Sequence, residues 1–450
     1  MDIFGSIMAF AILLTGGLMT VKLGFFQATH FGKALKEPFK KKMGTGGISP
    51  CQALATALGG SIGTANIAGT AGAILTGGPG AVFWMWAAGA FGMALKASEI
   101  ILAIKFRDAS PPTSAGGPMH YMVKGLGTRA LPLARAYAVS GSLAAMLGTA
   151  LVQSNTIAES CCQLINAYRP AYSPAVRLAA GAVTALLTGA VVFGGAKRIG
   201  RFSAAAVPFM ALGYAAAAIW VICANIGRLP SAFESIVKGA FGMRSALGGA
   251  AGYGFMRALR VGAARGVYSN EAGVGSSAMA HAASSETDPV RQSLLGIFEV
   301  FADTFIMCSL TAFAVLTSAS ALSSAATGMD AAFLTFSGVM GAKAASVFLS
   351  LSVLLFAFTS VIGWELYGEN CLTFLFGEKR RHVFKAVFLA LIPIGAITDT
   401  EICWKLGEVF NYLMAAPNLA ALLMLSGCVR REILSYKMFE KSRQRGYNKG

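Results

Sequence analysis

Residues 51–96 read CQALATALGGSIGTANIAGTAGAILTGGPGAVFWMWAAGAFGMALK, and they set the architecture of the whole chain. The segment is apolar enough to lie in a bilayer, but glycines interrupt it where a helix is normally most regular. At Gly59–Asn66 flexible backbone lies beside two hydroxyls and an amide. Inside a bilayer, free backbone N–H and C=O groups are tolerated only where they line a cavity or meet a partner. The break therefore predicts a site for a small charged solute; the alternative is close helix packing through small residues.

The composition is that of a protein that crosses a membrane many times. The 450 residues are 55% hydrophobic and only 13% charged, with a mean hydropathy of +0.63, whereas soluble domains carry about 25% charged residues. The net charge of +17 comes from basic residues in short loops between apolar segments, which argues against a nucleic acid partner. The eight cysteines contain no CxxC pair, so neither a zinc site nor a disulfide framework is expected.

Apolar segments long enough to span a bilayer recur along the chain and predict an all-α fold with about eleven transmembrane helices of about 20 residues. The second and the seventh span are interrupted by glycines, at Gly59–Gly63 and at Gly248–Gly254. The expected spans are 3–23, 52–75, 81–104, 136–165, 174–193, 202–226, 233–259, 293–318, 344–375, 383–397 and 403–426.

The two broken spans each open a block of five spans. Because five is odd, the two blocks lie in opposite orientations, which is the inverted-repeat plan of secondary transporters. The expected organisation is a peripheral helix in 1–26, a first repeat in 46–226, a second repeat in 230–428 and a basic tail in 429–450. No oligomer is implied.

The distribution of Lys and Arg predicts a plasma-membrane protein with its N-terminus outside and its C-terminus in the cytoplasm. The loop 22–42 is strongly basic, and it shares its expected side with several other basic segments. These are 105–135, 197–201, 257–291, 378–385 and the tail. Few basic residues fall on the other side, among them Arg169, Arg177 and Arg228.

Several motifs, spread over most of the chain, identify a family. They are Gln52-Ala53-Leu54, Gly63–Gly69, Gly77–Trp86, Ser269–Ser276 and Gly363-Trp364 with Tyr367-Gly368-Glu369. With these residues the chain resembles the alanine or glycine:cation symporters, also called the sodium:alanine symporters. The resemblance implies the sodium-coupled, leucine-transporter-like fold. The sequence departs from the family pattern at Ala65, usually glycine, and at Leu366, usually a tyrosine.

A zwitterionic amino acid needs donors for its carboxylate and acceptors for its ammonium, because unpaired charges are costly in an apolar pocket. The N–H groups at Thr64, Ala65 and Asn66 suit the carboxylate. Carbonyls of the second break, between Gly249 and Gly252, would receive the ammonium. The resemblance adds Gln153 and Ser360 to a pocket with Asn66, and Trp364 to its apolar wall. Asn155 lies mid-span near Gln153; for both, the alternative is an ordinary interhelical hydrogen bond.

The resemblance also implies a sodium site made of oxygens. Its ligands are the carbonyls of Gly59, Ile62 and Phe356 and the hydroxyls of Thr359 and Ser360. The alternative for the two hydroxyls is bonding to their own helix. Sodium enters as the coupling ion, with no other cofactor.

Four acidic residues within the expected spans need a separate explanation, because charges in a membrane are costly and often functional. Glu299 and Asp303 share a helix face and could relay protons, or could pair with arginines (Arg257, Arg260, Arg265 or Arg291), which is the preferred expectation. The other two acids are Glu99 and Glu408. Ser269–Ser276 is expected to be a gate or packing loop.

The sequence therefore predicts a sodium-coupled carrier of alanine or glycine that works by alternating access. A proton-coupled carrier or a glutamine carrier of the same fold is the nearest alternative. An intramembrane enzyme would need clustered nucleophiles, metal ligands or paired acids, which the His and Cys positions do not provide. A channel would need a continuous polar stripe, whereas the polar residues gather at the breaks.

Overall fold

The computed structural model describes residues 2–40, 48–108, 116–166, 174–241 and 250–447. These residues are helical apart from turns and one isolated bridge between Ile48 and Ser284. Within them, eight helical segments are long and apolar enough to cross a membrane. These are Phe4–Lys22, Ala81–Lys105, Thr128–Ile165, Pro174–Val192, Gly195–Ala224, Pro289–Thr317, Ala342–Phe376 and Thr400–Glu440.

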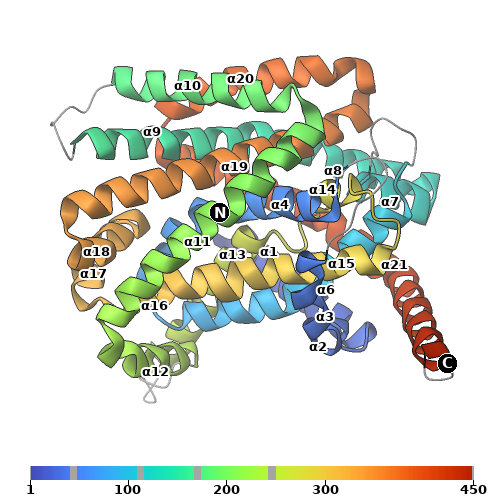
Figure 1. The fold of residues 1–450 in the computed structure, drawn as a ribbon, viewed down its shortest axis with the longest axis horizontal. Helices are drawn as coiled ribbons and strands as arrows, with labels where there is room; N and C mark the ends of the chain where they lie inside the picture. Colours follow the sequence, from blue (N-terminus) through green and yellow to red (C-terminus); the bar gives the residue numbers. More distant parts are fainter. Residues whose placement is uncertain (1, 41–47, 109–115, 167–173, 242–249, 448–450) are drawn as a thin grey trace.

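The main helices of the bundle follow the chain closely (Figure 1). They are α1 (Asp2–Lys22), α4 (Pro50–Ser61), α5 (Thr70–Gly77), α6 (Ala81–Lys105), α8 (Leu131–Leu143), α9 (Leu151–Asn166), α10 (Pro174–Val192), α11 (Gly195–Ala224), α13 (Ala250–Asn270), α15 (Pro289–Val300), α16 (Ser309–Thr317), α19 (Ala342–Phe376), α20 (Arg381–Ile397) and α21 (Thr400–Tyr447). Short helices join them: α2 (Phe26–Thr29), α3 (Phe31–Lys36), α7 (Pro118–Leu126), α12 (Leu229–Ala240), α14 (Ala278–Ala282), α17 (Ala319–Ser324) and α18 (Gly328–Met340).

Three of the expected eleven spans do not form one long apolar helix, each for a different physical reason. The second is divided into α4 and α5 by its glycine-rich break. The seventh falls on α12 and α13, and α13 carries Arg257, Arg260 and Arg265. The tenth, α20, has only 17 residues, about 26 Å at 1.5 Å per residue.

The first broken helix begins with a strong cap and ends at the expected glycines. Ser49 accepts a hydrogen bond from the Gln52 N–H, and the Gln52 side chain accepts one from the Ser49 N–H. This capping box satisfies N–H groups that the helix cannot. The α-helix stops at Ser61, and a π-helical turn, Ala65–Gly69, follows before α5.

The second unwound segment lies at 271–277, and the expected position at Gly248–Gly254 is wrong where the structure describes it. Residues 242–249, including Gly249, lie outside the described residues, and α13 is already helical from Ala250. Instead, α13 ends at Asn270 and a non-helical segment leads to α14. Within it Glu271, Gly273 and Gly275 have φ of 55°, 88° and 82°, values that an α-helix cannot accommodate. The motif Ser269–Ser276, expected as a loop, is therefore a helix end and a buried break.

Half-helices from the two breaks lie side by side. Helix α4 packs on α14, and α5 packs on α13. The start of α4 and the end of α14 are also bonded: the Ile48 N–H donates to the Ala283 carbonyl at 3.4 Å, and the Ser285 N–H donates to the Ile48 carbonyl at 2.8 Å. Arg107, just beyond α6, donates to the carbonyls of Ala282, Ser284 and Glu286. These bonds fix the chain at the end of α14, the half-helix that follows the second break.

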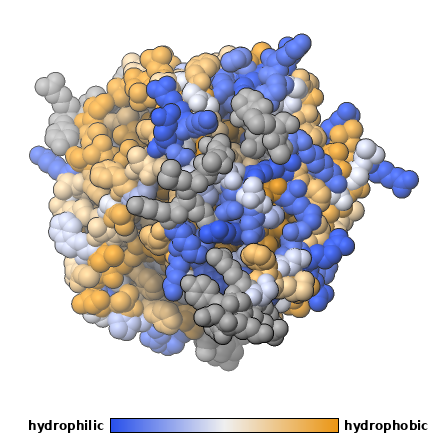
Figure 2. Space-filling model, turned by 45° about the vertical axis from the view of Figure 1, so that its right-hand side comes forward, coloured by the Kyte–Doolittle hydropathy of each residue, from blue (hydrophilic) through white to orange (hydrophobic). Residues whose placement is uncertain are grey.

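On the face drawn in Figure 2, hydrophilic residues gather over the centre and upper right, and a broad hydrophobic area covers the left. At the Lys22 end of α1, Lys33 pairs with Glu440 and Lys105 with Glu432, which brings three of the expected same-side segments together. Arg291 also lies at this end, bonded to Glu37 at 2.9 Å.

The expectation that 257–291 lies wholly on that side is wrong. Arg257 and Arg260 line a cavity with Ser6 and Phe10, near the start of α1. Helix α1 has 21 residues and is about 31 Å long, so its start and Lys22 lie at opposite ends of the bundle. The segment 257–291 therefore runs from one end of the bundle to the other, through α13 and the second break.

Candidate functional site

The first break leaves a backbone carbonyl open for a new partner. In a continuous helix the Gly63 N–H would bond to the Gly59 carbonyl. Here it donates to Asn66 Oδ1 at 2.8 Å, and the Gly59 carbonyl accepts from Ser360 Oγ at 3.1 Å. The break thus faces the middle of α19, where Ser360 is fully buried.

Four of the five expected sodium ligands meet at this point. Ser360 Oγ also lies 3.1 Å from the Phe356 carbonyl, and Thr359 Oγ1 lies 3.0 Å from the same carbonyl. Together with the Gly59 carbonyl they form a group of uncharged oxygens between α4 and α19. The fifth expected ligand, Ile62, is the C-cap residue of α4, three positions after Gly59, and it is also buried. Carbonyl and hydroxyl oxygens are the ligands that a hard cation prefers.

Thr64 and Gln153 bring the polar end of the break against α9. Thr64 Oγ1 lies 3.4 Å from Gln153 Oε1, and both side chains are buried. A β-carbon at Gly63 would lie 2.9 Å from Ser360 Oγ, closer than real contacts allow. A side chain at Gly63 would therefore displace the Ser360 hydroxyl from its place beside the break. Gln153, Ser360 and Thr64 surround this segment of backbone, and Ala65 follows it at the start of the π-helical turn.

Asn155 lies elsewhere. Its side-chain amide donates to the carbonyls of Gly395 (3.1 Å) and Thr398 (2.6 Å), and its Oδ1 accepts from Thr400 Oγ1 at 2.8 Å. These bonds fasten α9 to the junction between α20 and α21. The interhelical hydrogen bond is therefore the interpretation that the geometry favours for this residue.

Asn66 points toward the second broken helix. Its Nδ2 donates to Asp303 Oδ1 at 2.7 Å and to Ser269 Oγ at 3.1 Å. Ser269 Oγ also donates to Asp303 Oδ2 at 2.9 Å, and Thr304 Oγ1 lies 3.0 Å from the same oxygen. The buried carboxylate of Asp303 thus contacts both broken helices through uncharged partners.

Trp364 closes the other side of the second break. Its Nε1 donates to Glu271 Oε1 at 2.8 Å, and Ser276 Oγ donates to the other carboxylate oxygen of Glu271. Its ring makes an edge contact with the ring of Tyr367, with centroids 5.6 Å apart. Gly252, expected to offer a carbonyl to the substrate, lies instead near the start of α13.

The exposed backbone of the second break finds partners on three other helices. The Gly273 N–H donates to Glu99 Oε1 at 2.9 Å, and the Gly273 carbonyl accepts from Asn418 Nδ2 at 2.9 Å. The hydroxyl of Tyr137 donates to the Val274 carbonyl at 3.1 Å. Unwound backbone in a membrane protein needs such partners, since lipid offers none.

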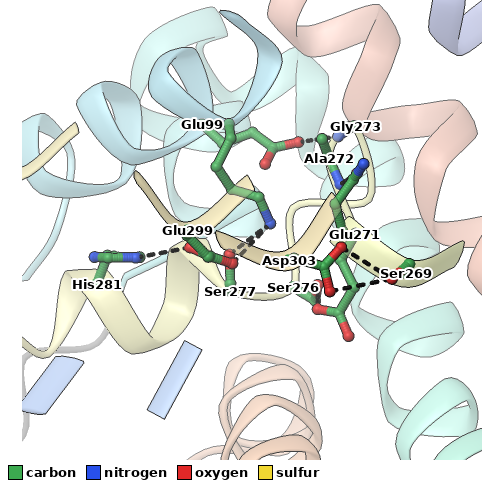
Figure 3. Close-up of polar contacts among 12 residues, drawn as sticks. Glu99, Ser269, Glu271, Ala272, Gly273, Ser276, Ser277, His281, Glu299 and Asp303 are labelled. Carbon is green, nitrogen blue, oxygen red and sulfur yellow. Dashed lines mark hydrogen bonds and ion pairs between the residues drawn. The ribbon is translucent and has the colours of Figure 1, made fainter. Parts of the chain in front are cut away.

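The acids on α15 and the following turn do not pair with the expected arginines. Glu299 lies 3.2 Å from Lys96 Nζ and 3.1 Å from His281 Nε2, and all three side chains are fully buried (Figure 3). Lys96 Nζ also donates to Ser277 Oγ at 2.8 Å, at the end of the second break. The expected pairing is wrong because Glu299 faces α6 and α14 and Asp303 faces Asn66 and Ser269, whereas Arg291 faces Glu37. Among the acids singled out from the sequence, Glu408 does pair with an arginine, Arg265, at 3.2 Å.

Several residues of this network had no role in the sequence-based prediction. The buried Lys96 lies in the quoted segment, three residues before Glu99, and a lysine among apolar residues signals a buried partner. Glu271 and Ser269 lie in the family motif Ser269–Ser276, which reads as a polar loop, and its two glycines, Gly273 and Gly275, are the only sequence signal of a break there. Asn418 and His281 have no comparable sequence signal.

A helical membrane protein whose two unwound segments meet buried polar side chains is built as a transporter rather than an enzyme. Comparison with known proteins agrees: residues 2–449 match the sodium:alanine symporter family, and the chain belongs to that family.

Two relatives and one solved structure illustrate the similarity. The chain is 36% identical to the sodium/alanine symporter AgcS of Methanococcus maripaludis, over 98% of this chain and 96% of the relative. It is 34% identical to the probable sodium/glutamine symporter GlnT of Bacillus subtilis, over 98% and 90%. The crystal structure of MhsT in complex with L-phenylalanine has a TM-score of 0.59 at 13% identity, covering 88% of this chain and 99% of MhsT. This last similarity shows the leucine-transporter-like fold.

Proposed function

We propose that the protein is a sodium-coupled symporter of a small neutral amino acid, alanine or glycine, that works by alternating access. The observation that carries the proposal is the group of uncharged oxygens between the first break and α19. Gly59, Phe356, Thr359 and Ser360 offer four such oxygens, linked through three hydrogen bonds: Ser360 Oγ to the Gly59 and Phe356 carbonyls, and Thr359 Oγ1 to the Phe356 carbonyl. Sodium would take the place of the hydroxyl hydrogen bonds, with the Ile62 carbonyl as a further ligand.

The amino acid is proposed to bind at Gly63–Ala65, beside this ion site. Its carboxylate would meet the free end of the break at Thr64 and Ala65, with Gln153 and Ser360 beside it. Its ammonium would meet the second break, now placed at 271–277, and Trp364 would bound the side chain. Asn66 is proposed to position Gly63 and to link the two breaks.

The proposal includes the expected organisation. It comprises two inverted five-helix repeats (46–226 and 230–428), a peripheral helix in 1–26, a tail in 429–450, and an N-terminus outside the plasma membrane. The contacts of α4 with α14 and of α5 with α13 support a pseudo-symmetric pairing of the breaks.

The nearest alternative is coupling to protons, and it has its own candidate group. Asp303 places a buried carboxylate against Asn66 and Ser269, so a charge change there would be felt by both broken helices. A glutamine carrier is the alternative for the substrate, because one relative bears that description.

The test is uptake of radiolabelled alanine into proteoliposomes under an inward sodium gradient, and separately under an inward proton gradient. Accumulation with sodium alone is expected. Accumulation with protons alone would overturn the sodium site and make Asp303 the candidate for the coupling group. Uptake of glutamine but not of alanine or glycine would overturn the substrate assignment.

A further inference from the structure

A groove between α1 and α13 opens on the outside of the helix bundle, away from the two breaks. It encloses a cavity of about 470 Å³. Its walls are apolar: Ile7 and Phe10 from α1 and Met256 from α13 are each more than half exposed, at 59%, 59% and 58%. In a membrane-crossing protein such exposed apolar walls face lipid.

Two arginines lie in this apolar setting without a partner among the side chains that the structure describes. Arg257 and Arg260 line the groove, and both are exposed. Neither makes an ion pair or a hydrogen bond with any side chain that the structure describes. The next arginine of α13 is different: Arg265 pairs with Glu408 at 3.2 Å and lies over the ring of Trp404, 5.8 Å from its centroid.

The position of the groove fits the headgroup region of a bilayer. Ser6, Ile7 and Phe10 belong to the first turns of the candidate span Phe4–Lys22. Arginine side chains near the end of a membrane helix extend toward lipid phosphates, because the charge is costly in hydrocarbon. The planar guanidinium binds phosphate oxygens in pairs, and residues three apart lie on one helix face.

We propose that the α1–α13 groove binds one anionic glycerophospholipid, with its phosphate on Arg257 and Arg260 and an acyl chain along Ile7, Phe10 and Met256. A soluble phosphate would satisfy the arginines but leave the apolar walls uncovered. A zwitterionic lipid brings its own cation to its phosphate and so competes with the two arginines. The charge and the walls together therefore select an anionic lipid.

The experiment uses the full-length protein purified in detergent, with native mass spectrometry to count bound lipid after addition of phosphatidylglycerol or phosphatidylcholine. The variant is Arg257→Gln/Arg260→Gln. Each arginine near an anionic headgroup contributes about 1 kcal/mol, so the preference for phosphatidylglycerol should fall about 30-fold in the double variant. The matched control, Lys197→Gln/Arg198→Gln, removes two exposed basic residues from the start of α11 and should retain the lipid.

A second variant tests the apolar half of the groove. Phe10→Ala leaves the charges in place and should also lower the bound fraction, because the acyl chain loses a wall. The thermal unfolding temperature should rise with phosphatidylglycerol for the wild-type protein and not for the double variant.

Three results would overturn the proposal. The first is equal retention of phosphatidylglycerol by the wild-type protein and the Arg257→Gln/Arg260→Gln variant. The second is equal stabilisation by phosphatidylcholine, which would remove the charge requirement. The third is equal stabilisation by inorganic phosphate, which would identify a free anion and not a lipid.

Discussion

At the scale of single residues, hydrogen bonds distinguish two amide side chains, Gln153 and Asn155, that look alike in the sequence. Gln153 and Asn155 are two residues apart in one polar run, but only Gln153 contacts the first break. Asn155 fastens α9 to the α20–α21 junction. Two positions along a helix are about 200° apart around its axis, so the two side chains point to different neighbours. The sequence identifies both residues as candidates for the substrate site, but it does not show which of them contacts the break.

The hydroxyls of α19 give the first prediction. Replacing Thr359 and Ser360 together by alanine should raise the sodium concentration for half-maximal uptake by about tenfold or more, because bonds to a charged group contribute about 1.5–3 kcal/mol. Sodium titration of alanine uptake in proteoliposomes measures the shift. Ser352→Ala is the control, since Ser352 lies on the same helix and bonds only to the Phe348 carbonyl. An unchanged sodium response in the double variant would place the ion elsewhere.

Asn66 and Asn155 give a contrasting pair. Asn66→Ala leaves the Gly63 N–H without its partner and removes one of the donors to the Asp303 carboxylate, so it should lower stability by about 1–3 kcal/mol and also impair alanine binding. Asn155→Ala should lower the unfolding temperature while the affinity for alanine stays the same. Thermal unfolding and equilibrium alanine binding, measured on both variants, separate the two roles. Loss of alanine affinity in Asn155→Ala would instead show that Asn155 belongs to the substrate site.

At the scale of elements, the continuous helices were predictable and the second break was not. Spans such as 81–104 and 174–193 agree with α6 and α10 because long apolar runs have one stable form in lipid. The first break was found because five glycines and small polar residues interrupt an otherwise apolar run. The second break carries Asn270, Glu271 and Ser276, which read as a polar loop. Only the backbone bonds of Gly273 and Val274 with Glu99, Tyr137 and Asn418 show that the segment lies inside the bundle.

The second break should tolerate no side chain at Gly275. Its φ is 82°, and a β-carbon would lie 2.5 Å from Pro118 Cγ. Left-handed backbone costs about 1–2 kcal/mol for other residues and overpacking about 1–3 kcal/mol, so Gly275→Ala should destabilise the protein by about 2–5 kcal/mol. Gly213→Ala in α11 has open space around the new carbon and should have little effect. Equal unfolding temperatures for the two variants would contradict the described break.

At the scale of the whole molecule, buried charges join helices that are distant in the sequence. Lys96 of α6, Glu299 of α15 and His281 of α14 form one network with no exposed atoms on their side chains. Burying three such groups is costly unless each has a partner. Here each does, and Ser277 ties the network to the second break. Composition alone showed that the intramembrane acids need partners, but only the packing of α15 against α6 shows which.

This network predicts strong coupling between two distant positions. Lys96→Met alone leaves Glu299 with only His281 and should cost about 3–5 kcal/mol. Lys96→Met combined with Glu299→Gln removes the uncompensated charge and should restore part of that loss. A double-mutant cycle on thermal unfolding measures the coupling. Additive effects of the two substitutions would show that the ion pair contributes nothing.

The bonds between Ile48 and the chain after α14 have a mechanical consequence. Two backbone hydrogen bonds hold the outer ends of α4 and α14 at fixed separation, and Arg107 holds the end of α14 against the end of α6. Neither half-helix can swing outward alone without breaking them. A passage that opens at this end of the bundle must therefore open by moving both half-helices together as one rigid unit, with the hinge at the two glycine-bearing breaks.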